Sequence, residues 1–131
     1  MAAPIIALID DDDVFQLTSS RMLRAINPEL NINQFANGAE ALTFFSENIN
    51  NPDLLPDIIL LDINMPYVDG WMFLQDFEKM KVNLAKQPTI YMVSSSIDPT
   101  DINKAKENEQ VEDYLIKPIT KAKFEVLVNH Q

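Results

Sequence analysis

Four consecutive aspartates, Asp10 to Asp13, follow an apolar run near the start of the chain and precede a second apolar pattern. Two carboxylates about 5 Å apart repel by roughly 3 kcal/mol at an effective dielectric near 20. The run therefore needs compensation, either by water or by a bound cation. A fifth aspartate, Asp62, ends another apolar run. If the two runs are neighbouring strands, these carboxylates lie close enough to share a divalent cation.

Short apolar runs that could be strands alternate with helical patterns. Three of them, PIIALI (4–9), DIILLDI (57–63) and TIYMVS (89–94), are nearly continuous in hydrophobic residues. Such runs are typical of strands buried on both faces of a parallel sheet. The weaker runs at 30–35 and 112–116 are expected to flank them. Helical patterns separate these five runs, and this alternation predicts a doubly wound, five-stranded parallel α/β sheet.

The helix boundaries follow from turn and capping signals. Asp12 and Asp13 start the first predicted helix, where exposed N–H groups favour negative charge. Asp98 is suited to be the N-cap of the fourth, with Pro99 at its first position. Helices are expected from the aspartates to 27–28, after 37–38, after 69–70, from 98, and from about 120. The longest irregular stretch is 46–57, and the methionines and phenylalanines are expected in the core.

The length and composition of the chain indicate one globular domain. The chain has 131 residues, 47% of them hydrophobic, and no cysteine. This length buries a single core without disulfides, and the absence of cysteine suits a reducing compartment. The first residues lack the basic flank of a signal peptide, and no stretch approaches the roughly 18 apolar residues of a membrane span. We expect a cytoplasmic protein that does not enter a membrane.

Charge is distributed unevenly along the chain. The formal net charge is −10, and residues 1–78 hold 13 acids against the two bases Arg21 and Arg24. Residues 79–131 hold 7 acids against 8 lysines. An acidic first half repels phosphates, which argues against binding to nucleic acid. It suits a metal cation or a basic partner.

Polar residues follow the strands at the edge where ligands bind in open α/β sheets. Each alone has an ordinary explanation, since an aspartate after a strand is often only a turn former or a helix cap. Their joint occurrence indicates a site. The residues at this edge are Asp10, Asp11, Asp62, Ser94, Ser95, Ser96 and Lys117.

An all-oxygen ligand set favours Mg²⁺, with Mn²⁺ as an alternative, because neither cysteine nor a suitable histidine is available. The one histidine, His130, is next to the end of the sequence and is expected to be neither a site nor a phosphodonor. A calcium loop is a poorer fit, since no glycine follows the aspartates at the required spacing.

Four motifs, ALIDDDD, LLDINMPYVDGW, YMVSSS and DYLIKPIT, resemble in their order the receiver domain of two-component response regulators. The resemblance spans essentially the whole chain. It implies a flavodoxin-like fold with strand order 2-1-3-4-5, forming a single receiver domain over 1–131 with no attached output domain. It also implies a histidine kinase or histidine phosphotransfer protein as donor and a downstream target protein. The receiver would not be an enzyme, because it catalyses only its own phosphorylation and dephosphorylation.

The resemblance assigns roles to the acidic residues. Asp62 would be the phosphoacceptor, and Lys117 would stabilise charge on the phosphoryl oxygens. Asp11 would ligate Mg²⁺ directly and Asp10 through water, with the backbone carbonyl of Asn64 as a further ligand. Asp62 would thus become an aspartyl phosphate.

The resemblance also assigns switch and tuning roles. Ser94 stands where the family has the hydroxyl that turns to the phosphoryl group, and Tyr114 where it has an aromatic that rotates inward. Ser95 is small and leaves room for phosphate, while Asn64 and Ser96 match positions that tune dephosphorylation. The fourth helix offers little to bury, so the face of helix four, strand five and helix five is the expected output surface, unless the phosphate is passed on in a relay.

Some positions depart from the family pattern. Tyr67 occupies a loop position where glycine is frequent, and ENEQVEDY lacks the glycine often found before the fifth strand. The connection at 46–57 is long. Lys117-Pro118 resembles the family's frequently cis peptide. The departures concern loop shape and partner choice and leave the acidic residues intact.

Two other functions remain open. Asp10 and Asp12 form the D-x-D of haloacid-dehalogenase-type phosphatases, but Val14 stands where that motif has threonine, and the labelled residue would be Asp10 instead of Asp62. A receiver fold could also serve as a phosphorylation-independent binding module. Failure of the folded protein to take up phosphate from acetyl phosphate with Mg²⁺ would favour that function.

Overall fold

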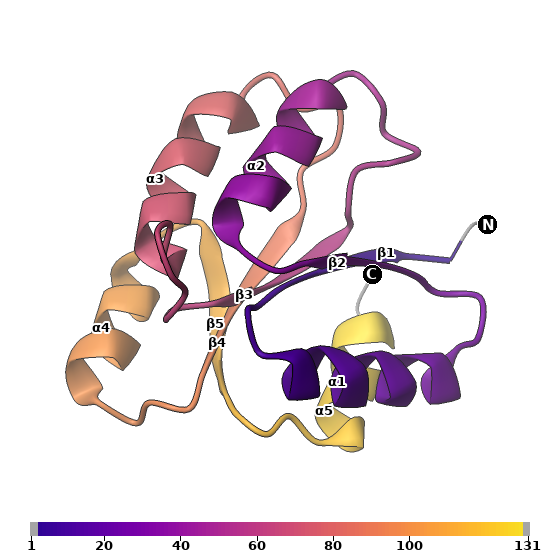
Figure 1. Cartoon of the computed structure of the whole chain (residues 1–131), viewed down its shortest axis with the longest axis vertical. Helices are drawn as coiled ribbons and strands as arrows, with labels where there is room; N and C mark the ends of the chain where they lie inside the picture. The colour runs from indigo at the N-terminus through magenta and orange to yellow at the C-terminus, as the bar shows by residue number, and fades with distance from the viewer. Residues whose placement is uncertain (1–2, 130–131) are drawn as a thin grey trace.

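The computed structural model of the chain describes residues 3–129, in which strands and helices alternate (Figure 1). The alternation confirms the predicted β-α order. The elements are β1 Ile5–Ile9, α1 Asp13–Ile26, β2 Asn31–Phe35, α2 Gly38–Glu47, β3 Ile58–Asp62, α3 Gly70–Lys81, β4 Thr89–Ser94, α4 Pro99–Glu107, β5 Val111–Ile116 and α5 Lys121–Asn129.

The five strands form one parallel sheet in the order β2-β1-β3-β4-β5, as predicted. Every residue of β1 and β3 is buried, which explains their continuous hydrophobic sequences. β2 and β5, the weaker sequence patterns, lie at the two edges. Ile9 of β1 pairs with Leu61 of β3, so these two strands end side by side.

Helices cover both faces of the sheet (Figure 1). α1 and α5 pack on one face, where Phe15, Leu23, Phe124 and Leu127 contribute to the core. The other face is covered by α2, α3 and α4, whose largest buried group is a set of phenylalanine rings. That set comprises Phe45, Phe73 and Phe77, with ring centroids 5.5–6.4 Å apart.

Short polar side chains begin the helices, as the sequence predicts for two of them. Oδ1 of Asp12 accepts hydrogen bonds from the N–H groups of Val14 and Phe15, and Asp13 is the first residue of α1. Asp98 caps α4 by accepting from Thr100 N–H, with Pro99 at the first position.

Two predictions need correction. α2 continues through Ser46 and Glu47, so the irregular connection begins only at Asn48. Not every methionine lies in the core, because Met72 is 45% exposed on the outer side of α3. His130 lies outside the described residues. Within residues 3–129, every helix falls short of the length and apolar character needed to cross a bilayer.

Candidate functional site

Three aspartates meet where β1 and β3 end. Asp10 directly follows β1, and Asp62 is the last residue of β3. Because these strands are parallel neighbours, their carboxyl ends bring both side chains to one edge. Asp10 is 2% exposed and Asp62 is 5% exposed, whereas Asp11 is open to solvent. One carboxylate oxygen from each residue lies within 4.8 Å of the others, so the three form a candidate metal site.

Backbone contacts fix both strand ends. Asp10 N–H donates to the carbonyl of Phe35 (3.0 Å), and Oδ1 of Asp10 accepts from Asp12 N–H (2.9 Å). Gly70 N–H donates to the carbonyl of Ile63 (2.8 Å) and places the start of α3 against Asp62. A Cβ at Gly70 would lie 2.7 Å from the Asp62 carbonyl oxygen, so the absence of a side chain permits this approach.

Lys117 provides the cation opposite the aspartates. Its Nζ lies 2.8 Å from Asp10 Oδ2 and 3.7 Å from Asp62 Oδ1. The same ammonium lies 4.6 Å from the centroid of the Phe15 ring. Lys117 N–H donates to the carbonyl of Ser94 (2.9 Å), which anchors the end of β5 to the end of β4. The Lys117–Pro118 peptide bond is cis, as the resemblance implies.

Burial and like charges together raise the pKa of Asp62 from 3.8 to about 7. Desolvation is the largest cause, and the neighbouring carboxylates of Asp10 and Asp11 raise the pKa further. The Lys117 ammonium and a hydrogen bond from the backbone N–H of Asn64 act in the opposite direction. Asp62 therefore holds its proton near neutral pH more firmly than an ordinary aspartate.

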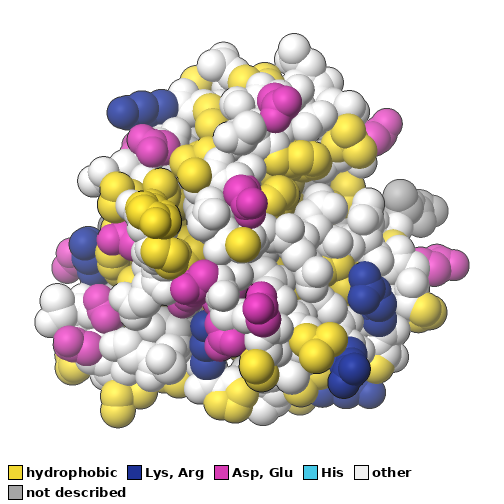
Figure 2. Space-filling view, in the orientation of Figure 1, with side chains coloured by type: hydrophobic (Ala, Val, Ile, Leu, Met, Phe, Trp, Pro, Cys, Tyr) yellow, Lys and Arg dark blue, Asp and Glu magenta, His cyan; other side chains and the backbone are white. Residues whose placement is uncertain are grey.

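The site has the charge and donor set of a divalent cation site. When all three carboxylates are ionised, they outnumber the one ammonium by two negative charges. Oδ2 of Asp10 is buried, and the Lys117 ammonium, 2.8 Å away, is its one polar partner within the described residues. Figure 2 shows Asp and Glu side chains gathered between the start of α1 and the β3–α3 loop, with one basic side chain among them. These residues fit Mg²⁺, which prefers carboxylate and water oxygens.

Ser94 and Tyr114 both contact the loop that follows β4. Ser94 is 1% exposed, and its Oγ accepts a hydrogen bond from Ser96 N–H (3.0 Å). The Tyr114 hydroxyl donates to the carbonyl of Ser96 (2.9 Å), so the ring is directed toward this loop. Ser95 and Asn64 are exposed, and Ser96 is half-buried.

One positioning residue, Gln16, had no place in the sequence predictions. Its side-chain amide is close to three carbonyls, those of Leu8 (3.0 Å), Asp10 (3.1 Å) and Phe35 (3.2 Å), and so ties α1 to the ends of β1 and β2. Helical spacing could have identified it, because Gln16 lies seven residues before the buried Leu23 and thus on the same face. Asp12, by contrast, caps α1, which does not suit the catalytic D-x-D alternative.

The fold and this edge define a flavodoxin-like α/β protein with an acidic site after β1 and β3. The family model of the response regulator receiver domain matches residues 6–129. The chain therefore belongs to the receiver domain family of two-component response regulators.

Individual relatives agree with that assignment. The sensor histidine kinase CheAY of Helicobacter pylori is 32% identical over 87% of this chain, which spans 13% of that protein. The probable methanogenesis regulatory protein FilR2 of Methanothrix harundinacea is 28% identical, with 88% of this chain and 73% of FilR2 covered.

Solved structures show the same fold. A two-component response regulator from Cytophaga hutchinsonii has a TM-score of 0.86 and 28% identity, with 99% of this chain and 97% of that chain covered. The chemotaxis protein CheY4 of Vibrio cholerae, at 20% identity, shares the fold with a TM-score of 0.77 over 98% of each chain.

Proposed function

We propose that the chain accepts a phosphoryl group from a phosphohistidine donor onto Asp62 in a Mg²⁺-dependent reaction. Receiver domains of response regulators are signalling proteins that interact with histidine kinases or phosphotransfer proteins. The observation that carries the proposal is the position of Asp62. Its carboxylate is held among two acids and an ammonium, at the edge where the sheet is open to a ligand.

Asp62 acts as the nucleophile. One of its carboxylate oxygens attacks phosphorus, and a P–O bond forms as the P–N bond of phosphohistidine breaks. The electron pair of that bond stays on the ring nitrogen, and because the other ring nitrogen carries a proton, the histidine leaves as neutral imidazole. Deprotonated Asp62 is required, so the nearby ammonium of Lys117 favours the reactive form. The same ammonium faces the negative charge that develops on the phosphoryl oxygens.

Asp10, Asp11 and Asp62 would hold the metal ion with the backbone carbonyl of Asn64. When bound, Mg²⁺ supplies positive charge that balances these carboxylates and the incoming phosphoryl oxygens. The hydroxyl of Ser94 then donates to a phosphoryl oxygen, while the exposed Ser95 leaves space for the group.

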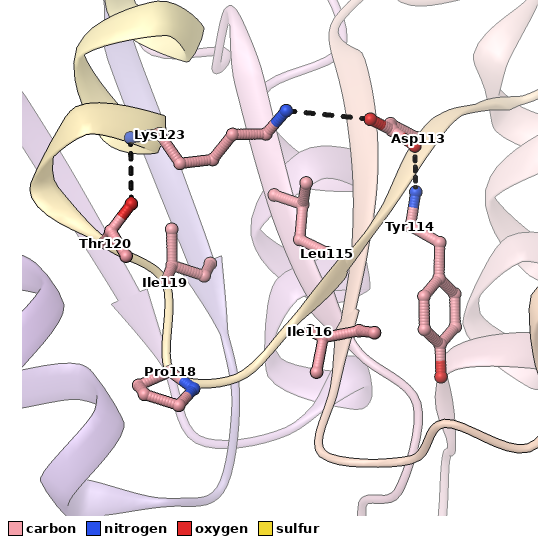
Figure 3. Close-up of a pocket in the computed structure, with 8 residues that line it drawn as sticks. All are labelled: Asp113, Tyr114, Leu115, Ile116, Pro118, Ile119, Thr120 and Lys123. Atoms are coloured by element: carbon pink, nitrogen blue, oxygen red, sulfur yellow. Dashed lines mark hydrogen bonds and ion pairs between the residues drawn. The ribbon is translucent and has the colours of Figure 1, made fainter.

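The output surface is the face formed by α4, β5 and α5, unless the phosphate is passed on. Of the nine residues of α4, Ala105 alone is buried, so this helix is weakly held. Between β5 and α5 lies a cavity of about 330 Å³, at whose rim Lys123 pairs with Asp113 at 3.8 Å (Figure 3). Its lining residues are Asp113, Tyr114, Leu115, Ile116, Pro118, Ile119, Thr120 and Lys123.

Acetyl phosphate provides a test that needs no partner protein. With Mg²⁺, the intact mass of the wild type should increase by one phosphoryl group. The wild type without Mg²⁺ and the Asp62→Asn variant should show no increase in mass. Asp76→Asn, an exposed aspartate of α3, is the matched control and should behave as wild type. A folded wild type that takes up no phosphate overturns the proposal and favours a phosphorylation-independent binding module.

A further inference from the structure

Helix α4 combines little apolar burial with specific polar contacts to its neighbours. Ala105 is its one buried residue, so the helix gains little from hydrophobic packing. Two side chains of α4 instead make polar contacts outside the helix. Asp101 accepts a hydrogen bond from Ser96, and the Lys104 ammonium lies 4.4 Å from the centroid of the Trp71 ring on α3.

Ser96 connects both switch residues to α4. Its N–H donates to Ser94 Oγ (3.0 Å), and its carbonyl accepts from the Tyr114 hydroxyl (2.9 Å). On the other side, its Oγ accepts from Asp98 N–H (3.1 Å) and donates to Asp101 Oδ2 (3.1 Å). Ser96 therefore cannot shift without changing its contacts with the first turn of α4.

Asp101 determines where the Ser96 hydroxyl points. A hydroxyl has one hydrogen, and the Asp101 carboxylate accepts it in a half-buried, charge-assisted bond. That hydrogen is therefore directed at α4. Ser96 thus acts on the phosphorylation site through its backbone, which contacts Ser94 and Tyr114.

We infer that Asp101 is a positioning residue that couples α4 to the phosphorylation site through Ser96; the inference rests on the proposed function of Asp62. When the Ser94 hydroxyl turns to a phosphoryl group, Ser96 N–H loses its acceptor. Ser96 then shifts, and its bond to Asp101 carries the shift to α4. Removal of this bond leaves the chemistry at Asp62 intact and uncouples α4 from it.

The test compares Asp101→Ala, Asp101→Asn and the control Asn103→Ala, an exposed α4 residue. Before phosphorylation, Asp101→Ala should raise amide hydrogen exchange over 98–107 about tenfold and shift the Tyr114 ring resonances. Asp101→Asn retains an acceptor oxygen, so its amide exchange and its Tyr114 ring resonances should match those of the wild type. Asn103→Ala should also leave both quantities unchanged. Unchanged exchange and ring resonances in Asp101→Ala would overturn the inference.

Phosphorylation with acetyl phosphate and Mg²⁺ supplies the second measurement. Asp101→Ala should take up phosphate within about twofold of the wild-type rate, but without the wild-type change in exchange over 98–107. The fluorescence of Trp71, the one tryptophan of the chain, reports the same movement through Lys104. If phosphorylated Asp101→Ala showed the wild-type change in exchange over 98–107, the coupling would be refuted. If the wild type took up no phosphate, the function of Asp62 would be refuted instead, and the comparison of exchange and ring resonances before phosphorylation would decide the role of Asp101.

Discussion

The Lys117 ammonium lies closer to Asp10 (2.8 Å) than to Asp62 (3.7 Å). The lysine is therefore shared between a metal-ligand candidate and the phosphoacceptor. A cation that neutralises Asp10 would weaken the first contact and leave Lys117 free to face Asp62. The same lysine can then serve the resting site and the reacting site.

Lys117→Ala tests the electrostatic role of this lysine. Loss of the ammonium should raise the pKa of Asp62 above about 7, because Lys117 lowers that pKa. It should also slow phosphorylation from acetyl phosphate about 100-fold, a typical effect of losing one preorganised charge. Carboxyl NMR titration and intact-mass kinetics measure the two effects. Lys123→Ala, which removes an exposed pair, should match the wild type in both.

Binding of Mg²⁺ should weaken as the pH falls through 7. Protons compete with the metal for Asp62, whose pKa burial and the neighbouring acids raise to about 7. Below that pH, the apparent affinity should fall by up to about tenfold per pH unit. Calorimetry at pH 6 and pH 8 measures the change, and Asp62→Asn should remove the part due to this group. Equal wild-type affinities at both pH values would be inconsistent with the raised pKa.

The raised pKa of Asp62 also makes the free energy of unfolding depend on pH. Between pH 4 and 7 the folded protein retains a proton on Asp62 that the unfolded chain releases. This group therefore favours the folded state most at low pH, and its contribution is lost as the pH rises toward 7. In urea unfolding, Asp62→Asn should be more stable relative to wild type at pH 8 than at pH 4.5. An equal stability difference at both pH values would show that Asp62 ionises at its ordinary pKa in the folded protein.

Neighbouring aspartates should respond differently to neutralisation. Asp11→Asn removes a carboxylate of the cluster and should abolish Mg²⁺-dependent phosphorylation. Asp13→Asn alters the first turn of α1 and should cost up to about 1 kcal/mol of stability, with phosphorylation unchanged. Intact mass and urea unfolding separate the two effects. If Asp13→Asn blocked uptake as well, the division of the acidic run would be wrong.

Gly70→Ala should displace the phosphoacceptor. Its Cβ would lie 2.7 Å from the Asp62 carbonyl oxygen and 2.9 Å from Ile63 Cα, both backbone atoms that cannot rotate away. We expect a loss of about 1–3 kcal/mol in the free energy of unfolding and slower phosphorylation. Gly38→Ala is the control, because its nearest contact is the Val68 side chain at 3.0 Å, which can yield. A Gly70→Ala protein as stable and active as Gly38→Ala would contradict this tight packing.

Local patterns were sufficient to predict most of the fold. β1 and β3 are short apolar runs with no alternation, as is typical of strands in a parallel sheet covered on both faces. The capping roles of Asp12 and Asp98 were predictable because an N-cap bonds to residues only two or three positions further along the chain. The predicted irregular stretch begins two residues too early: Ser46 and Glu47 carry no signal that ends a helix, and both are helical in the fold.

The contacts within the site were less accessible to sequence reasoning. The approach of Asp10 and Asp62 follows from strand order, but the shorter distance from Lys117 to Asp10 depends on side-chain packing. The bond between Ser96 and Asp101 joins a loop to a helix, and no periodic pattern marks it. Such contacts depend on the conformation of the β4–α4 loop, which single-residue preferences do not determine.

The most direct test of the central claim identifies the residue that carries phosphate. The protein is phosphorylated with acetyl phosphate and Mg²⁺, the acyl phosphate is reduced with borohydride, and peptides are mapped by mass spectrometry. Reduction should convert the aspartate at position 62 alone to homoserine. Modification at Asp10 instead, or a phosphorylated protein with Asp62 unmodified, would contradict the assignment of Asp62 as the phosphoacceptor.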